Sequence, residues 1–219
     1  MKFLAETQLV EVLKTSLKNI YTRDCVKIFE EVSLGYGIAD IVVSDLKKTA
    51  CQDSRSEQLL DLFDINIYSL VLKSEGLAIS DVINITRCSK QAISRSLCKL
   101  LDNGYVINDE NRLVANRFYE FPCRNNFAIE AKLKDWKRAL KQAYRYKWFA
   151  EYSFVVLDAY YAKAALKNRE YFVKYNVGLA SISPDGTLQR HFNPIRQAPF
   201  DLKMQILFSE KVKHHALSK

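Results

Sequence analysis

Two charged residues, Glu130 and Lys132, interrupt the apolar segment NFAIEAKL at residues 126–133. In a β-strand, residues two positions apart project to the same face, so this spacing places a carboxylate beside an ammonium group on one side of a sheet. Buried charges are costly unless they are paired. The pair therefore serves either as a plain ion pair or as part of a catalytic site, and the two alternatives differ in which other polar residues accompany it.

Two further carboxylates stand where apolar residues would be expected. Asp40 lies in the middle of a predicted strand, Ile38 to Val43. Glu6 belongs to a predicted helix over residues 4–20, and projection at 100° per residue places it within the apolar stripe of that helix. Glu6 is thus either a satisfied core acid or a site residue. The stripe comprises Leu9, Val10, Leu13, Leu17 and Ile20.

The elements that would position these residues are strands and helices in alternation. A strand over Val26 to Val32 precedes that of Asp40 across the turn LGYG. The strand of Glu130 is followed by a basic helix over about 137–150 and the strand YSFVVLD. Further along the chain we expect a helix over AYYAKAALKNREYFVKYN and a hairpin over VGLASISPDGTLQRHF, whose turn carries Asp185-Gly186.

The middle of the chain, residues 53–117, has a different sequence pattern, in which short helices replace the alternation of strands and helices. Three short helices are predicted there, the third of which, residues 89–102, begins at the N-cap Ser89 and ends before Gly104. Two short strands around the turn NDEN follow. Three helices and a hairpin of this length resemble a winged helix-turn-helix domain with residues 89–102 as the recognition helix.

The remainder of the chain, residues 1–50 and 118–196, resembles the PD-(D/E)xK superfamily of restriction-endonuclease-like nucleases. The resemblance rests on the order of a helix with Glu6, a strand with Asp40 after GIA, a strand with Glu130-Ala131-Lys132, and a helix with Gln142 and Tyr146 four positions apart. It implies an α/β fold, a mixed sheet flanked by helices, with a winged helix inserted: domains 1–52 plus 118–219 and 53–117. The chain departs from the family pattern in two ways. Residues 40 and 130 are 90 positions apart, where the family usually has a short hairpin, and the proline that often precedes the aspartate is missing before IAD.

The resemblance implies a magnesium-dependent endodeoxyribonuclease, with Mn²⁺ as an alternative ion. Asp40, Glu130 and the carbonyl of Ala131 would hold the metal, since hard cations prefer oxygen ligands. Lys132 would orient the attacking water or lower its pKa. The three remaining site residues would act indirectly: they are Glu6, which binds a second ion or orients the ligands, and Gln142 and Tyr146, which support the site or the DNA backbone.

Contacts to duplex DNA are expected from the recognition helix and the wing. Gln and Arg side chains make bidentate contacts with adenine and guanine, whereas lysines suit phosphates. The predicted DNA-binding residues are Ser89, Lys90, Gln91, Ser94, Arg95, Lys99 and Arg112. A winged helix that binds protein is the alternative. The basic, aromatic stretch 132–147 is expected to track a phosphate backbone, or else to be an ordinary solvated face.

Bulk composition agrees with an anionic partner. The chain has 219 residues, a formal net charge of +8 and a pI near 9.1, and basic proteins of this kind favour nucleic acids or membrane surfaces. No signal sequence or membrane span is recognised, so a soluble, cytoplasmic protein without a membrane partner is expected, with a homodimer as a candidate assembly. Five cysteines without a C-x-x-C pair are expected to be reduced core residues. A non-catalytic DNA-binding protein and a transposon-end nuclease are the alternative functions.

Overall fold

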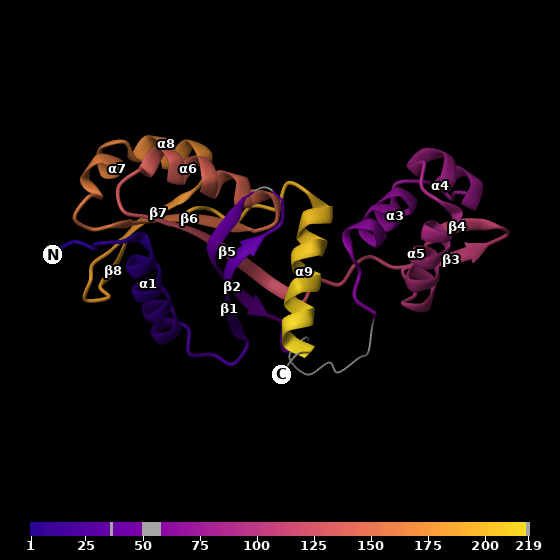
Figure 1. Ribbon diagram of the computed structural model, residues 1–219, viewed down its shortest axis with the longest axis horizontal. Helices are drawn as coiled ribbons and strands as arrows, with labels where there is room; N and C mark the ends of the chain where they lie inside the picture. Colours follow the sequence, from indigo (N-terminus) through magenta and orange to yellow (C-terminus); the bar gives the residue numbers. More distant parts are fainter. Residues whose placement is uncertain (36, 50–57, 218–219) are drawn as a thin grey trace. The chain divides into compact units, whose positions relative to one another are not determined.

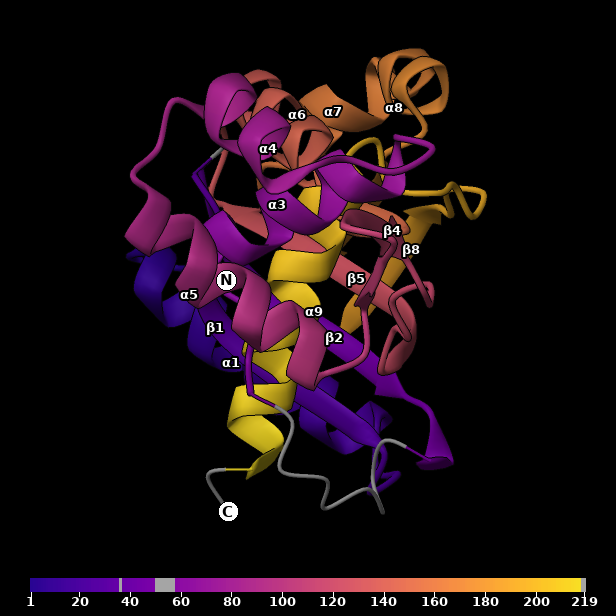
Figure 2. The same ribbon diagram turned by 90° about the vertical axis from the view of Figure 1, so that its right-hand side faces the viewer.

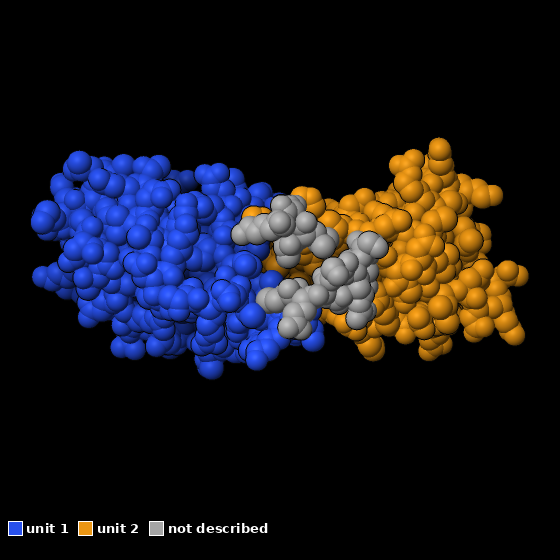
Figure 3. All heavy atoms as spheres, turned by 90° about the horizontal axis from the view of Figure 1, so that it is seen from below, with its two compact units in different colours: residues 1–51, 123–202 blue, residues 52–122, 203–219 orange. Residues whose placement is uncertain are grey.

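The computed structural model describes residues 1–35, 37–49 and 58–217. Contacts divide the chain into two compact units. Unit 1 comprises Met1–Cys51 and Cys123–Leu202, and unit 2 comprises Gln52–Pro122 and Lys203–Lys219 (Figure 3). Unit 2 is therefore formed by an insertion in unit 1 together with the C-terminal segment.

These bounds differ from those expected. The sequence analysis assigned residues 118–122 and 203–219 to the first domain, whereas their contacts place them in unit 2. The expected boundary at residues 52–53 lies outside the described residues. The difference arises because residues 203–219 follow unit 1 directly in sequence but pack against residues far earlier in the chain.

Unit 1 is built on a six-stranded mixed sheet with the order β1-β2-β5-β6-β7-β8. The pairs β5–β6 and β6–β7 are parallel, and the other neighbouring pairs are antiparallel. The strands are β1 (Val26–Ser33), β2 (Ile38–Leu46), β5 (Cys123–Lys132), β6 (Tyr152–Asp158), β7 (Gly178–Ile182) and β8 (Leu188–Phe192). The expected α/β class with a mixed sheet flanked by helices is confirmed. Unit 2 leaves the sheet between β2 and β5, which are hydrogen-bonded neighbours.

Helices cover both faces of this sheet. One helix, α1 (Glu6–Ile20), packs on one face, and the other face is covered by a layer of three helices (Figure 1). This layer consists of α6 (Trp136–Arg145), α7 (Lys163–Lys167) and α8 (Arg169–Tyr175), with the 3₁₀ turn η1 (Tyr146–Trp148) following α6. Helices that connect parallel strands cross over a face of the sheet, which explains why α6, α7 and α8 share one side.

The core under α1 follows from two sequence periods. Leu9, Leu13 and Leu17 recur every four residues, so they form one buried stripe of the helix. Alternate residues of the central strands meet this stripe, among them Ile41 and Ile129. Because these odd-numbered positions face α1, the even-numbered positions of β2 and β5 face the α6 side of the sheet.

Three predicted helical features of unit 1 need correction. The expected helix over residues 159–176 is broken into α7 and α8 at Asn168, whose side-chain amide donates to the carbonyl of Ala164 at 2.8 Å and so caps α7. The expected helix over 137–150 is α6, which starts one residue earlier and gives way to η1 after Arg145. The cysteines are not uniformly core residues: among the described ones Cys123 is buried, whereas Cys98 is exposed.

The described residues of unit 2 form helices, a hairpin and a helix from the C-terminal segment (Figure 2). They are α3 (Leu62–Leu72), α4 (Ile79–Thr86), α5 (Lys90–Asp102), β3 (Val106–Asp109), β4 (Arg112–Ala115) and α9 (Leu202–Leu217). Leu77, which lies between α3 and α4, forms an isolated bridge to Leu113 of β4 and so extends the hairpin. The turn residues Glu110 and Asn111 both have positive φ, 45° and 66°, as tight hairpins of the primed type require.

The segment around α9 completes the core of unit 2. Ile206 is fully buried in the same hydrophobic cluster as residues of α3 and α5. The carboxylate of Glu210, 5% exposed, accepts the backbone N–H of Leu60 at 2.7 Å and the hydroxyl of Tyr119, and pairs with Lys213 at 3.1 Å. Leu60 and Tyr119 lie near the two ends of the insertion, so one side chain of α9 holds both ends. This role was not foreseen for the C-terminal residues.

Candidate functional site

The expected site lies where β2 and β5 part. Their antiparallel ladder runs up to the pair Ile41–Ile129 and stops there, although β2 begins at Ile38 and β5 continues to Lys132. Beyond this pair, a side chain replaces backbone pairing: Oδ2 of Asp40 accepts the N–H of Ala131 at 2.7 Å. The parting of the strands brings polar groups of both strands together at a point where a continuous sheet would hold only ladder bonds.

Tyr146 holds the parted strands from the side of η1. Its buried hydroxyl is hydrogen-bonded to the carbonyl of Ile38 at 2.6 Å and to Oε2 of Glu130. Gly37 precedes β2 with φ of +126°, a conformation that favours glycine, and its Cβ position would lie 3.8 Å from the Tyr146 ring. One side chain thus contacts β2 and β5 exactly where their backbones no longer pair. The sequence analysis expects Tyr146 to support the site or the DNA backbone, and its hydrogen bonds are to the strands of the site.

Two carboxyl groups of this site have raised pKa values. Glu130 is 1% exposed, and burial raises its pKa; the Tyr146 hydroxyl opposes this effect, and the charge of Asp40 adds to it. Burial also raises the pKa of Asp40, while the N–H of Ala131 lowers it. Desolvation penalises the charged form of a carboxyl group, so burial is the main cause of both raised pKa values.

Lys132 lies between two of the acids. Its Nζ atom is 3.0 Å from Oε2 of Glu6 and 3.3 Å from Oε1 of Glu130. Burial alone would lower the pKa of Lys132, but the surrounding carboxylates outweigh burial and the pKa is raised. The ammonium group is therefore protonated at neutral pH and acts as a fixed positive charge, so it is unsuited to accept a proton from water.

Glu6 reaches the site from the first turn of α1. The projection placed Glu6 on the buried stripe, but its side chain is 47% exposed, because it is the first residue of the helix and extends past the core. The ion pair with Lys132, from an element 126 residues away in sequence, is what brings Glu6 to the site. Of the two alternatives for Glu6, the structure excludes the core acid.

One acidic residue of this region, Glu31, was missed by the sequence analysis. Its neighbours in β1 pair with the neighbours of Asp40, Glu30 with Ile41 and Val32 with Ala39, so Glu31 stands opposite Asp40. Glu31 is exposed, has φ of +50°, and its charge contributes to the raised pKa of Asp40. A non-glycine residue held in this conformation within a strand is uncommon. Counting the hairpin register back from the turn would have revealed this acid.

Gln142 occupies α6 one helical turn before Tyr146. Its Oε1 atom is buried and has no hydrogen-bond partner among the described residues. An unsatisfied buried acceptor is costly, so this amide oxygen is available to a donor that the protein itself does not provide. The structure does not bring Gln142 into hydrogen-bond contact with Asp40, Glu130 or Lys132.

The donor set suits a hard cation. Asp40, Glu130 and the carbonyl of Ala131 offer oxygen atoms, the ligands that Mg²⁺ and Mn²⁺ accept, and the two carboxyl groups have raised pKa values that a cation would lower. The described residues contain no cluster of three or more His, Cys, Asp or Glu side chains arranged to hold a metal. Any metal here would therefore depend on two carboxylates, a backbone carbonyl and non-protein ligands.

The residues expected to bind DNA lie in unit 2, and several of them already have structural partners. Ser89 caps α5 by accepting the N–H of Ala92 at 3.3 Å. Lys99 pairs with the buried carboxylate of Asp64 and lies 3.9 Å from Asp61. The guanidinium group of Arg112 donates to the carbonyl of Gly76 at 3.0 Å. The four predicted residues that α5 exposes are Lys90, Gln91, Ser94 and Arg95.

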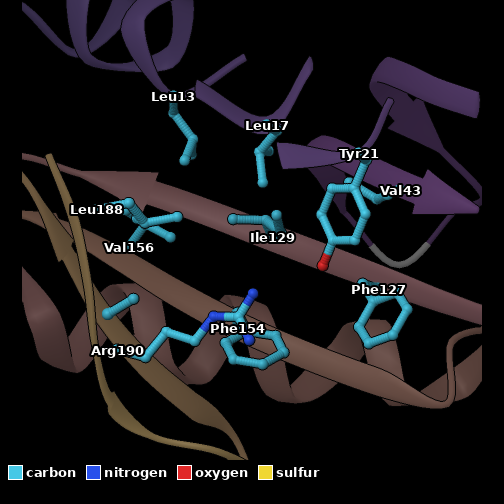
Figure 4. A pocket seen from close by; sticks show the side chains of 11 residues that line it. Leu13, Leu17, Tyr21, Val43, Phe127, Ile129, Phe154, Val156, Leu188 and Arg190 are labelled. Atoms are coloured by element: carbon cyan, nitrogen blue, oxygen red, sulfur yellow. The ribbon is translucent and has the colours of Figure 1, made fainter. Parts of the chain in front are cut away.

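A second candidate site is an apolar cavity of about 60 Å³ between α1 and the sheet of unit 1. It is lined mainly by aliphatic and aromatic side chains, including Leu13, Ile129 and Phe154. Figure 4 shows that Tyr21 and Arg190 bring a hydroxyl and a guanidinium group to its edge. The volume corresponds to about two water molecules, so the cavity is a packing defect of the α1 layer and offers no room for a substrate.

Comparison with known proteins gives no relative: no family model, curated protein or solved structure matches the chain. Within the described part of the chain, every helix is too short or too polar to cross a lipid bilayer. Function must therefore be inferred from the geometry of the site itself.

Proposed function

We propose that this protein is a metal-dependent endodeoxyribonuclease that hydrolyses phosphodiester bonds at the junction of β2 and β5, in restriction, phage or mobile-element DNA cutting. The observation that carries the proposal is the parting of these strands at Asp40 and Glu130, with Lys132 beside them. Beside the parted strands, Asp40 and Glu130 have raised pKa values, which a bound cation would lower.

Each residue of the junction would have a distinct task. Asp40, Glu130 and the carbonyl of Ala131 would hold Mg²⁺ or Mn²⁺, which when bound supplies charge neutralisation at the scissile phosphate and an activated water. Lys132, protonated and held by Glu6 and Glu130, would orient that water through its charge. Tyr146 would fix Glu130 by its hydrogen bond and so keep the carboxylate aligned.

The arrangement of elements supports the same proposal. A helix, an antiparallel pair and a parallel βαβ unit, in the order α1-β1-β2-β5-α6-β6, is similar to the core of PD-(D/E)xK nucleases. In unit 2 the order α3, the Leu77 bridge, α4, α5 and the β3–β4 hairpin is similar to a winged helix. Insertion at a strand connection leaves the flanking strands paired, as is observed for β2 and β5.

A non-catalytic DNA-binding protein is a second candidate, and the state of Glu130 favours it. This carboxylate is 1% exposed, and both of its oxygens already have partners, Tyr146 and Lys132. A metal would have to displace or share these partners. In a protein that only binds DNA, the same contacts would stabilise the parted strands without any reaction.

Incubation of purified protein with supercoiled plasmid and either Mg²⁺ or EDTA separates the two candidates. We expect the wild-type protein to produce nicked or linear plasmid in Mg²⁺ and none in EDTA. The Asp40→Asn variant should produce none in Mg²⁺ either. The matched control is Asp45→Asn, the same change on the same strand, where Asp45 pairs with Val26 far from the junction. The nuclease proposal fails if Asp40→Asn cuts as fast as Asp45→Asn, or if the wild-type protein makes no product in Mg²⁺ or Mn²⁺.

A further inference from the structure

The positive charge of the protein is unequally divided between its two units. Unit 1 contains 21 Lys and Arg against 14 Asp and Glu, a net charge of +7, whereas unit 2 contains 12 against 11, a net charge of +1. The insertion alone, residues 52–122, has 8 basic and 10 acidic residues, a net charge of −2. The hairpin turn of unit 2 is itself acidic at Asp109 and Glu110. The unit expected to read DNA is therefore not the one that carries the excess positive charge.

Within unit 1 the excess charge lies on the helical layer opposite α1. We name this face the α6–α8 surface. Two exposed acids belong to it, Asp135 and Glu170, which leaves a net charge of +7. The exposed basic residues that define the surface are Lys134, Lys137, Arg138, Lys141, Arg145, Lys163, Lys167, Arg169 and Lys174.

The α6–α8 surface is continuous although its parts are far apart in sequence. The ring of Trp136 lies 5.9 Å from that of Tyr171, and the ring of Tyr144 lies 5.5 Å from that of Tyr175, so aromatic contacts join α6 to α8. Figure 1 shows both helices over the same face of the sheet. Tyr171 is 45% exposed and Tyr160 is 65% exposed, and aromatic groups among lysines are typical of surfaces that contact nucleic acids.

This surface begins beside the candidate site. Strand β5 ends at Lys132, and α6 starts at Trp136 after a connection of three residues. Strand β6 is parallel to β5, with Leu157 opposite Lys132, so the connection to α7 leaves the same edge of the sheet. A polyanion bound along α6 and α7 would therefore have the parted strands next to it.

We propose that the α6–α8 surface binds the phosphate backbone of duplex DNA and supplies most of the affinity of the protein for its substrate. The inference rests on the proposed nuclease function, and it assigns the affinity to unit 1 rather than to the insertion. Because each phosphate contact releases counterions, binding through this surface depends steeply on salt and hardly on base sequence. The exposed residues of α5 then add sequence preference to a complex that unit 1 already holds.

The test compares two double charge reversals in the full-length chain. Lys141→Glu with Lys167→Glu removes charge from two helices of the α6–α8 surface, and Arg23→Glu with Lys48→Glu makes the same change of net charge at exposed positions elsewhere in unit 1. Binding of a fluorescent 30-base-pair duplex is measured by anisotropy in EDTA over a range of salt concentrations. We expect the first variant to lose about tenfold or more in affinity, with a salt slope reduced by about 2, and the control to lose about twofold or less.

Equal losses in the two variants would overturn the proposal, because net charge alone would then explain them. Unchanged duplex binding in the Lys141→Glu/Lys167→Glu variant would also overturn the proposal. If that variant lost binding to phosphatidylserine vesicles while it still bound the duplex, the surface would be a membrane-binding surface instead. If the wild-type protein binds no duplex, both this proposal and the nuclease proposal fail. Salt-dependent duplex binding through Lys141 and Lys167 without cleavage in Mg²⁺ would support the surface and overturn only the nuclease.

Discussion

Buried carboxylates occur in both units, but their surroundings differ. In unit 2, Asp64 accepts the backbone N–H of Asp61 and pairs with Lys99, and Glu210 combines the N–H of Leu60 with Lys213. In unit 1, Glu130 has a hydroxyl and a lysine that it shares with Glu6, and its pKa is raised. The two buried acids of unit 2 thus each accept a backbone N–H, whereas the described partners of Glu130 at the strand junction are side chains.

The largest effect is expected when this contrast is tested by the change Glu130→Gln. Cleavage in Mg²⁺ should fall by about 10³-fold or more, equivalent to about 4 kcal/mol in the activation barrier, because an amide removes one metal-binding charge. Stability should be unchanged or increased, since the amide avoids the desolvation of a buried carboxylate. Plasmid cleavage rates and urea unfolding measure the two effects, and a strongly destabilised but active variant would refute the contrast.

The change Glu210→Ala should have the opposite profile. Loss of this carboxylate removes one shared acceptor of the Leu60 N–H, the Tyr119 hydroxyl and Lys213, and removing one partner of a buried ion pair costs about 3–5 kcal/mol. Both tryptophans, Trp136 and Trp148, belong to unit 1. Circular dichroism should therefore show early loss of helix while tryptophan fluorescence keeps its midpoint. A shift of both signals together would mean that the units do not unfold separately.

Base reading by α5 is expected to have a smaller effect. Arg95→Ala should reduce discrimination among duplex sequences by about 1–3 kcal/mol while binding to unrelated DNA persists, because Arg95 is exposed on α5 and the proposed phosphate contacts are on the α6–α8 surface. Cys98→Ala on the same helix is the control, because Cys98 is exposed and is not among the predicted DNA contacts. Competition binding with a randomised duplex library measures the preference. If discrimination survives intact, the predicted recognition helix has a different partner, such as a protein.

The smallest expected effect is a pH dependence of the stability of unit 1. The folded-state pKa values of Asp40 and Glu130 are raised, so the stabilisation from their protonated forms is present below their ordinary pKa values, 3.8 and 4.5, and is lost as pH rises through the folded values. The wild-type protein should therefore lose stability relative to the double variant Asp40→Asn/Glu130→Gln as pH rises above about 4. Tryptophan fluorescence in urea with EDTA measures this difference, and a constant difference would contradict the raised values.

Short-range sequence patterns predicted the strands of unit 1 well. Alternating and continuous apolar runs gave β2, β5 and β6 within a few residues, because strand period and turn residues are local properties. The strand spacing also placed Glu130 and Lys132 side by side, and they form an ion pair at 3.3 Å. Of the residues that meet them from other elements, Glu6 was singled out by helical periodicity, whereas Tyr146 was proposed through family resemblance alone.

Long-range contacts were beyond the sequence patterns. Glu210 bonds to Leu60 and Tyr119, which lie 150 and 91 positions away, and no local period indicates such a contact. Glu31 was missed for a related reason, since its position opposite Asp40 depends on the register of a hairpin rather than on either strand. Lys99 was expected to bind phosphate, but it forms an ion pair with Asp64 of another helix. Sequence patterns thus indicate which charged residues occupy positions where apolar residues are expected, but they do not predict the residues with which these charges pair.

The contact of α9 with both ends of the insertion has a consequence for the order in which the protein matures. During synthesis, residues 58–122 leave the ribosome long before Ile206 and Glu210, which their core requires. The strands and helices of unit 1 are complete by residue 202. Unit 1 is therefore able to fold before the insertion, which still lacks the residues of α9. A nascent chain arrested after residue 202 would therefore expose an unfinished insertion to proteases and chaperones. Helix α9 thus completes the core of the insertion only after all residues of unit 1 have been synthesised.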